Sequence, residues 1–220
     1  MYGLAACSVV GRLYISDWDN DCVHAVPLNT DDQDDDSIDD PDDDSTSWNV
    51  ANQPAGLSLT AGEPPNVLVA CHGAGKVQEW SPEGILIRQI QLPDESKLIW
   101  HAVQLSDAEL LVSHEGSLHR VIVVSADDGE VIRRCDEVDA VQLQYPRSVV
   151  VDRDLGRVLV ADQCNNRIVE AEEDLTGARQ LELNVNDGPA WPYGLHLDQN
   201  RRRLYVTEWN HGRILRVDLP

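Results

Sequence analysis

The sequence predicts an all-β fold built from one repeated four-stranded unit, and three observations support this prediction. Short β-branched runs are separated by turn residues, and no long stretch carries apolar residues at helical spacing. A segment near the N-terminus, YGLAACSVVGRLYISDW (2–18), aligns without a gap with YGLHLDQNRRRLYVTEW (193–209). Such internal similarity indicates an array of one structural unit.

Three further copies lie between these two, so the chain contains five units. One anchor position follows the second apolar run of each unit, and the steps between successive anchors are 54, 43, 48 and 46 residues. The anchors are Asp17, Cys71, His114, Asp162 and Glu208. A period of about 40–50 residues with short strands is typical of the blades of a β-propeller.

Each unit is predicted to be an antiparallel meander. Turn signals such as Asp154-Leu155-Gly156 and Asn165-Asn166 separate the apolar runs of unit four, because Gly and Asn tolerate the backbone angles of tight turns. The expected strands of unit four lie near 147–152, 157–161, 167–171 and 179–183. A single meander cannot bury both of its faces, so we expect the units to stack around a common axis.

Two motifs resemble the NHL repeat. They are P-x-G-L-x-L-D followed by R-L-Y-V-T-E-W-N-x-G-R-I in unit five, and P-R-S-V-V-V-D followed by R-V-L-V-A-D-Q-C-N-N-R-I in unit four. The resemblance is strong in units four and five, moderate in unit one and weak in units two and three. It implies a single NHL-like β-propeller domain over residues 1–220, in a family whose propellers usually have six blades.

The predicted blades lie near 2–53, 54–97, 98–140, 145–188 and 191–220. Five units depart from the usual six, and the last unit stops at Leu219-Pro220, before any outer strand. No spare strand precedes Tyr2 to fill that place. We therefore expect an incomplete last blade, in either a fragment or a ring closed without the usual strand exchange.

The net charge of −22 comes from 39 acidic and 17 basic residues, and ten Asp residues between Asp31 and Asp44 supply almost half of it. With almost no apolar residues, the segment 30–47 is predicted to be a disordered acidic insertion between the third and fourth strands of unit one. Its Asp spacing does not fit an EF-hand loop, which needs Gly at the sixth and Glu at the twelfth position. A tolerated loop insertion is favoured over low-affinity binding of calcium or a basic protein.

The cysteines and the N-terminus bear on cellular location. The five cysteines are odd in number and lack paired spacings, the start lacks a secretory signal, and no segment is apolar for the length of a bilayer. We expect a cytoplasmic protein with reduced thiols and no membrane association. The cysteines are Cys7, Cys22, Cys71, Cys135 and Cys164.

Acid and base residues recur across one hairpin of each late unit. Asp162 precedes Arg167 by five residues, and Glu208 precedes Arg213 by the same spacing. We interpret both as structural turn pairs, in which the acid also accepts hydrogen bonds from the turn. Units two and three keep a base at the partner position, Lys76 and His119, but replace the acid with Cys71 and His114.

That replacement raises a metal hypothesis, because thiolate and imidazole ligands suit zinc. The weak candidates in units two and three are Cys71, His72, His101, His114 and His119. Among NHL-like propellers, the peptidyl-hydroxyglycine amidating lyases use an axial zinc. No CxxC or HxxxH spacing is present here, so we predict no metal and no cofactor, with a metal-dependent lyase or hydrolase as an alternative.

Strand alternation predicts a binding face. The start of the first strand and the turn between the second and third strands share one rim of a meander. This places Tyr2, Trp18, Trp100, His101, Tyr145, Arg147, Trp191, Tyr193 and Trp209 on one rim, with the acidic insertion on the other. Aromatic and Arg side chains anchor many interfaces, although packing of these rings between blades is the alternative for each single residue.

We therefore predict a non-enzymatic platform for a protein or peptide ligand. Resemblance to NHL domains implies a wider role as the substrate-recognition part of a tripartite-motif ubiquitin ligase, although this chain contains no RING or B-box zinc pattern. RNA binding, which some NHL propellers perform, is disfavoured by the excess of acidic residues. The one dense basic cluster, Arg201–Arg203, is expected in a turn on the rim of the acidic insertion.

Overall fold

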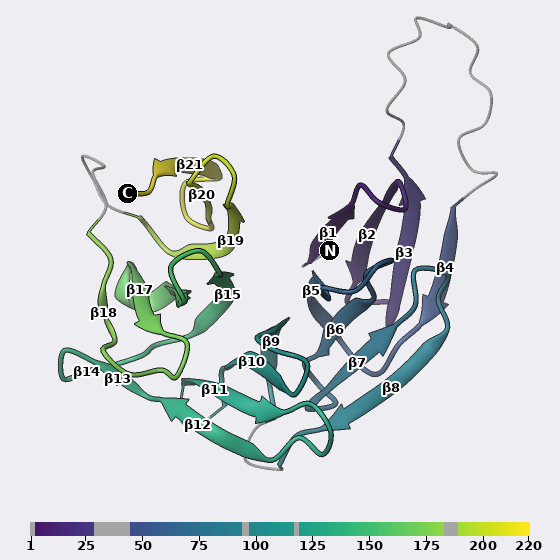
Figure 1. Ribbon diagram of the computed structural model, residues 1–220, viewed down its shortest axis with the longest axis horizontal. Coiled ribbons are helices and arrows are strands. Elements are labelled where there is room, and N and C mark those ends of the chain that lie inside the picture. Colours follow the sequence, from purple (N-terminus) through teal and green to yellow (C-terminus); the bar gives the residue numbers. More distant parts are fainter. Residues whose placement is uncertain (1–2, 29–44, 94–96, 117–118, 183–188) are drawn as a thin grey trace, which may run out of the picture.

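The computed structural model describes residues 3–28, 45–93, 97–116, 119–182 and 189–220. Five small antiparallel sheets surround one axis as the blades of a β-propeller (Figure 1). Within the described ranges the only helical element is the 3₁₀ turn η3 (Gln163–Asn165). The predicted all-β class and the five-bladed architecture are confirmed.

Blades 1 and 2 are four-stranded meanders in which each strand pairs with the next. Blade 1 contains β1 (Leu4–Cys7), β2 (Arg12–Asp17), β3 (Cys22–Pro27) and β4 (Thr46–Asn49). Blade 2 contains β5 (Pro54–Leu59), β6 (Val67–Cys71), β7 (Lys76–Trp80) and β8 (Leu86–Gln91).

Blade 3 is a four-stranded meander as well, and a short hairpin leads from it to blade 4. The blade contains β9 (Ile99–Gln104), β10 (Glu109–His114), β11 (Arg120–Ser125) and β12 (Val131–Cys135). The hairpin contains β13 (Glu137–Val138) and β14 (Val141–Gln142).

Blade 4 has four strands close to the predicted bounds, and blade 5 has three. Blade 4 contains β15 (Pro146–Asp152), β16 (Arg157–Asp162), β17 (Arg167–Glu172) and β18 (Arg179–Gln180). Blade 5 contains β19 (Pro192–Asp198), β20 (Arg203–Glu208) and β21 (Arg213–Asp218).

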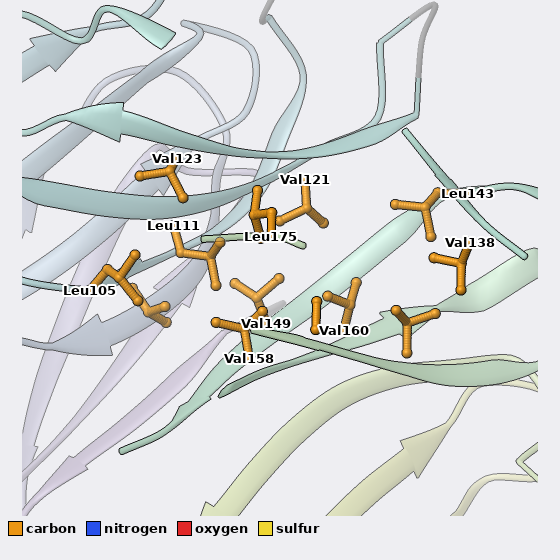
Figure 2. Packing of buried hydrophobic residues seen from close by; sticks show 13 residues of the cluster. Leu105, Leu111, Val121, Val123, Val138, Leu143, Val149, Val158, Val160 and Leu175 are labelled. Carbon is orange, nitrogen blue, oxygen red and sulfur yellow. The ribbon is translucent and has the colours of Figure 1, made fainter. Parts of the chain in front are cut away.

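The interior lies between neighbouring blades. Between blades 3 and 4, for example, Leu111 and Val123 face Val149 and Val160, and all four are almost fully buried (Figure 2). Equivalent apolar layers join blades 1 and 2, blades 2 and 3, and blades 4 and 5. These layers explain the sequence pattern, because each β-branched run supplies one face to each neighbour.

The array is open between blades 5 and 1, where β19 and β1 face each other across the gap (Figure 1). Leu4 on blade 1 is 57% exposed and Ile214 on blade 5 is 67% exposed. Ile168, at the corresponding position of blade 4, is buried in the layer against blade 5. The face of blade 1 that is turned away from blade 2, and the face of blade 5 that is turned away from blade 4, are therefore not covered by a neighbouring blade. We call these the outward faces of blades 1 and 5.

Two expectations about local boundaries need correction. Thr46 and Ser47 lie in β4, paired with Ala25 and His24, although they were expected within the disordered insertion 30–47. The Asp31–Asp44 tract itself lies outside the described residues, between β3 and β4 in the sequence. Arg120 lies opposite the anchor His114. The prediction that His119 occupies this partner position is wrong, because the blade 3 turn is one residue longer.

In the described part of the chain, no helix has the length and apolar character needed to cross a membrane.

Candidate functional site

One end of the propeller axis carries a continuous cluster of aromatic rings. Trp18 stacks on Trp100 with 5.6 Å between ring centroids and 15° between planes. Trp100 lies edge-on to Tyr193 at 6.2 Å, and Tyr193 lies 5.3 Å from Trp209. We call this cluster, with His72, Glu115, Arg147 and Gln163, the axial face.

Two repeated positions of the blade supply the axial face. The residue directly after each anchor lies at the turn between the second and third strands, and these residues are Trp18, His72, Glu115, Gln163 and Trp209. The second position of the first strand supplies the inner members, which are Ala55, Trp100, Arg147 and Tyr193. Trp18 of blade 1 contacts Trp100 of blade 3, and the inner position of the intervening blade 2 is the small, buried Ala55.

Irregular pairing at the start of β15 and β19 sets the direction of two inner side chains of the axial face. The pairing register of β15 shifts between Pro146 and Val149, and that of β19 shifts between Pro192 and Leu195. Such bulges bend a strand and redirect its side chains. Arg147 and Tyr193 lie within the two irregular segments, so their side chains turn toward the axis.

Arg147 is the centre of the polar contacts. Its guanidinium carbon lies 3.9 Å from the centroid of the Trp100 ring and 5.6 Å from that of Tyr193. Arg147 Nη1 donates to Glu115 Oε2 at 3.0 Å, and Nε donates to Gln163 Oε1 at 2.7 Å. The Trp100 indole N–H donates to the same Glu115 oxygen. These contacts fix the cation between a carboxylate and aromatic faces.

His72 completes the aromatic layer behind Trp100, with ring centroids 4.5 Å apart. Its Nδ1 lies 3.0 Å from the Ile99 carbonyl, which can only accept, so Nδ1 carries the proton. Burial lowers the pKa of His72 from its ordinary value. The ring is therefore neutral at neutral pH and acts as an aromatic wall.

His101 lies deeper than predicted, between the first strands of three blades. Nε2 donates to the Leu57 carbonyl at 3.1 Å, while Nδ1 accepts the Val149 amide N–H at 3.2 Å. Burial lowers the pKa of His101. Since both ring nitrogens bind backbone, this histidine ties β5, β9 and β15 together, and its nitrogens do not face a ligand.

A small cavity of about 130 Å³ opens at the centre of the axial face. Trp100, His101, Arg147 and Tyr193 line it, together with residues of β1 and β5. Gly56 is required there, because an added Cβ would lie 2.4 Å from His101 Cδ2.

The remaining predicted face residues lie at the margin. The Tyr145 ring lies 5.2 Å from the Arg147 guanidinium and 4.4 Å from the His119 ring. Trp191 is 39% exposed, and its backbone N–H donates to Asn166 Oδ1 at 2.9 Å. Tyr2 lies outside the described residues.

The acid–Arg pairs lie across their hairpins. Arg167 Nε donates to Asp162 Oδ2 at 2.7 Å, and the Gln144 amide donates to Asp162 Oδ1 at 2.7 Å. Glu208 pairs with Arg213 in the same way and accepts the Ala190 amide at 2.7 Å. Each acid thus joins its hairpin to the segment that precedes the blade.

The five weak metal candidates do not converge. Cys71 is buried with its thiol near the Val69 carbonyl and the Gln78 side chain, and burial raises its pKa to about 12. His114 is buried at the anchor of blade 3. Among the residues that the structure describes, the only group of ligand atoms close enough to hold a metal is Asp17, Cys22 and His24.

Comparison with known families identifies the repeat. The NHL repeat model matches residues 143–170, which cover β15, β16 and part of β17. The protein is an NHL-repeat β-propeller. The match falls on unit four, one of the two units in which the sequence motif is strong. A search of curated proteins finds no match to this NHL-repeat chain.

Solved structures share the fold. The hydrazine synthase of Kuenenia stuttgartiensis is 17% identical with a TM-score of 0.69, over 98% of this chain and 64% of its own. Virginiamycin B lyase from Staphylococcus aureus is 14% identical with a TM-score of 0.65, over 100% of this chain and 70% of its own. A chain of the nidogen/laminin complex is 14% identical with a TM-score of 0.72, over 99% of this chain and 75% of its own. At these identities the likeness concerns the fold alone, and this chain spans 64–75% of the lengths of those chains.

Proposed function

We propose that this NHL-repeat propeller is a non-enzymatic platform whose axial face binds a protein or peptide. The observation that supports this most directly is the continuity of Trp18, Trp100, Arg147, Tyr193 and Trp209 around one opening. Trp, Tyr and Arg are the residues most enriched among those that carry binding energy in interfaces. Trp209 is 60% exposed and offers an accessible edge to the cluster.

The contacts of Arg147 favour a polypeptide over a polyanion. Its charge is already paired with Glu115, so the guanidinium offers a flat stacking surface more than an anion site. Backbone amides and apolar side chains of a peptide suit such a surface.

The arginine cluster Arg201–Arg203 gives no support to RNA binding. Arg201 pairs with Asp198 at 3.0 Å, Arg202 with Asp152 at 2.7 Å, and Arg203 with Asp218 at 3.0 Å. Affinity for nucleic acid comes largely from cations that neutralise phosphates. Here the three guanidinium groups already face carboxylates.

Catalysis at the axial face has little support from the histidines there. His101 uses both nitrogens on backbone groups, and His72 is buried against the Trp18 and Trp100 rings with its Nδ1 proton held by a carbonyl. A general base needs a free nitrogen within reach of a substrate proton. A metal-dependent lyase or hydrolase at this opening is therefore the weaker candidate, and the fold that the chain shares with virginiamycin B lyase is compatible with either function.

The substrate-recognition role in a tripartite-motif ubiquitin ligase rests on the family resemblance. It requires a RING region elsewhere, and the axial face would then hold the substrate. The platform proposal stands without that extension.

Selection of peptides from a display library against this chain tests the proposal. The affinities of the selected peptides are then compared between the parent and the variants Tyr193→Ala and Arg147→Ala. Central anchors cost about 2 kcal/mol or more when truncated, which is about a 30-fold loss of affinity. Tyr205→Ala is the matched control, since Tyr205 lies mid-strand in the same blade and contacts His196.

Equal binding by the parent, Tyr193→Ala and Arg147→Ala would contradict the proposal. If charge reversal of Arg201–Arg203 abolished that binding at the same time, the site would lie on the opposite rim. An anionic partner such as RNA would then be favoured.

A further inference from the structure

A second cluster of reactive side chains lies away from the axial cavity, on the outward face of blade 1. His24 Nε2 lies 3.4 Å from Asp17 Oδ2 and 3.4 Å from Cys22 Sγ. All three ligand atoms lie within 4.8 Å of one another. Asp17 and Cys22 are paired across the β2–β3 hairpin, and His24 follows two residues later on the same face of β3.

The separations match those around a tetrahedral zinc ion. Zinc bonds are about 2.0–2.2 Å to nitrogen or oxygen and about 2.3 Å to sulfur, so two ligand atoms lie about 3.4 Å apart for N and O and about 3.6 Å for N and S. The observed distances are 3.4 Å for both pairs.

The hydrogen-bond pattern does not suit a nucleophilic triad. In a Cys-His-Asp relay the acid holds one ring nitrogen and the thiol faces the other. Here Asp17 and Cys22 both face Nε2 of His24. A neutral imidazole has one lone pair, and its convergence with a thiol sulfur and a carboxylate oxygen is the arrangement of a metal site.

Comparison with the later blades shows what blade 1 lacks. The residue opposite the anchor acid is Arg167 in blade 4 and Arg213 in blade 5, and each pairs with its acid. In blade 1 that position is Cys22, so Asp17 keeps its carboxylate but has no arginine across the hairpin. A bound divalent cation would supply the missing positive charge.

The carboxylate is held in place by its own turn. The backbone amides of Asp19 and Asn20 each donate to Asp17 Oδ1 at 3.2 Å, and Asn20 Nδ2 donates to Oδ2 at 2.8 Å. Such outer contacts orient metal ligands in known sites. The side chains of His24 and Asp17 are 43% and 26% exposed, so an ion could enter from solvent and keep an open position.

We propose that Asp17, Cys22 and His24 bind a zinc ion with three protein ligands and one open coordination position. The three residues do not line the axial cavity, although Asp17 directly precedes Trp18 of the axial face, and the proposal does not rest on the platform function. The site also differs from the five candidates predicted in units two and three, because its ligands come from a single hairpin at positions i, i+5 and i+7.

Cobalt substitution tests the proposal on the untagged 220-residue chain. Co²⁺ bound by a thiolate and an imidazole gives thiolate-to-cobalt charge-transfer absorption and visible ligand-field bands. We expect one equivalent of Co²⁺ to saturate both signals, and Zn²⁺ to displace it. Competition with a chromophoric chelator gives the zinc affinity.

The variants distinguish the ligands from the other cysteines. Cys22→Ser should remove the charge-transfer band, and His24→Val, which copies Val169 of blade 4, should weaken zinc binding by at least about 10–100-fold, the loss typical of an outer-shell change alone. Cys22→Arg should restore the acid–Arg pair of the later blades and abolish binding without unfolding. Cys164→Ser is the matched control and should bind cobalt like the parent.

An unchanged charge-transfer band in Cys22→Ser, or its loss in Cys164→Ser, would overturn the assignment. So would binding of Co²⁺ by the parent without any thiolate band. Circular dichroism of each variant separates loss of a ligand from loss of the fold.

Discussion

The guanidinium of Arg147 lies 3.9 Å above the Trp100 ring, and both side chains donate to the same oxygen of Glu115. The three residues come from the first strand of blade 4, the first strand of blade 3 and the turn that follows β10. The contact therefore joins neighbouring blades at the axis while presenting an aromatic surface. Stability and the proposed ligand binding share this contact, so a substitution here should affect both.

Removal of the Arg147 side chain should weaken the fold without abolishing it. Arg147→Ala loses the cation–π contact and one partner of Glu115, and we expect the free energy of unfolding to fall by about 1–2 kcal/mol. Urea unfolding followed by tryptophan fluorescence measures this change. Arg134→Ala is the control, because Arg134 is 63% exposed and lies 3.7 Å from Asp136. Equal stabilities of the two variants would show that the Trp100 contact contributes nothing.

A substitution at Gly56 tests how much the hydrogen bonds of His101 between blades contribute to stability. In Gly56→Ala the new Cβ would lie 2.4 Å from His101 Cδ2 and 2.7 Å from the Trp100 carbonyl oxygen. His101 cannot move aside without losing its backbone hydrogen bonds, so we expect a loss of about 1–3 kcal/mol, typical of overpacking.

The matched substitution for Gly56 is Gly62→Ala, where the nearest atom lies at an ordinary 3.5 Å. It should be neutral within about 0.5 kcal/mol. In the double variant Gly56→Ala/His101→Ala the loss should be smaller than the sum of the single losses, because the clash with the His101 ring disappears and only the contact with the Trp100 carbonyl oxygen remains. Additive losses would mean that His101 does not limit the space at Gly56.

The sequence was sufficient to predict the blades, because the anchor position recurs after the second apolar run of each unit at a similar spacing, although its residue type changes. It also brought Trp100, Arg147 and Tyr193 to one rim, since strand alternation needs only the correct strand order. The same column of residues after each anchor contains His72 and Glu115, but their types did not mark them as part of an aromatic face. Their place became visible only through the contacts with Trp100.

Strand alternation does not predict how deeply each side chain lies along the propeller axis. His101 shares its strand with Trp100, yet the irregular pairing of β9 sends the two side chains to different surroundings. The blade 3 turn has one extra residue, so Arg120 and not His119 lies opposite the anchor His114. The acid–Arg pattern of the later blades does not indicate the Asp17, Cys22 and His24 cluster, because the blade 1 hairpin has Cys22 where those blades have arginine.

Deletion of Asp31–Asp44 should leave the fold intact. The flanking strands are fixed by pairing, since Pro27 stands opposite Arg12 and Thr46 opposite Ala25. Long insertions in surface loops add little to the free energy of folding. The deletion should end before Thr46, because β4 begins there. Thermal unfolding checks this, and a melting temperature lowered by more than about 4 °C, which is about 1 kcal/mol in a domain of this size, would show that the tract is structural.

The stability of the fold should decrease when the pH is lowered below neutral, because three buried histidines resist protonation in the folded chain. The pKa values of His72, His101 and His114 are all lowered, and burial is the largest cause for each. The unfolded chain has ordinary histidine pKa values of about 6.5, so below that pH it binds protons that the folded chain does not. The stabilisation is therefore fully present above about pH 6.5 and is lost as the pH falls through the folded pKa values.

Urea unfolding between about pH 7.5 and pH 5.5 measures this slope, which is at most about 1.4 kcal/mol per pH unit for each histidine. His114→Cys removes one of the three groups and copies Cys71, the anchor of blade 2, which is buried in the same way. Its slope should be smaller than that of the parent, whatever the change in absolute stability, because one fewer proton is taken up on unfolding. If His114→Cys and the parent lose stability at the same rate, then His114 is protonated equally in both states, and burial at the blade 3 anchor does not keep it neutral.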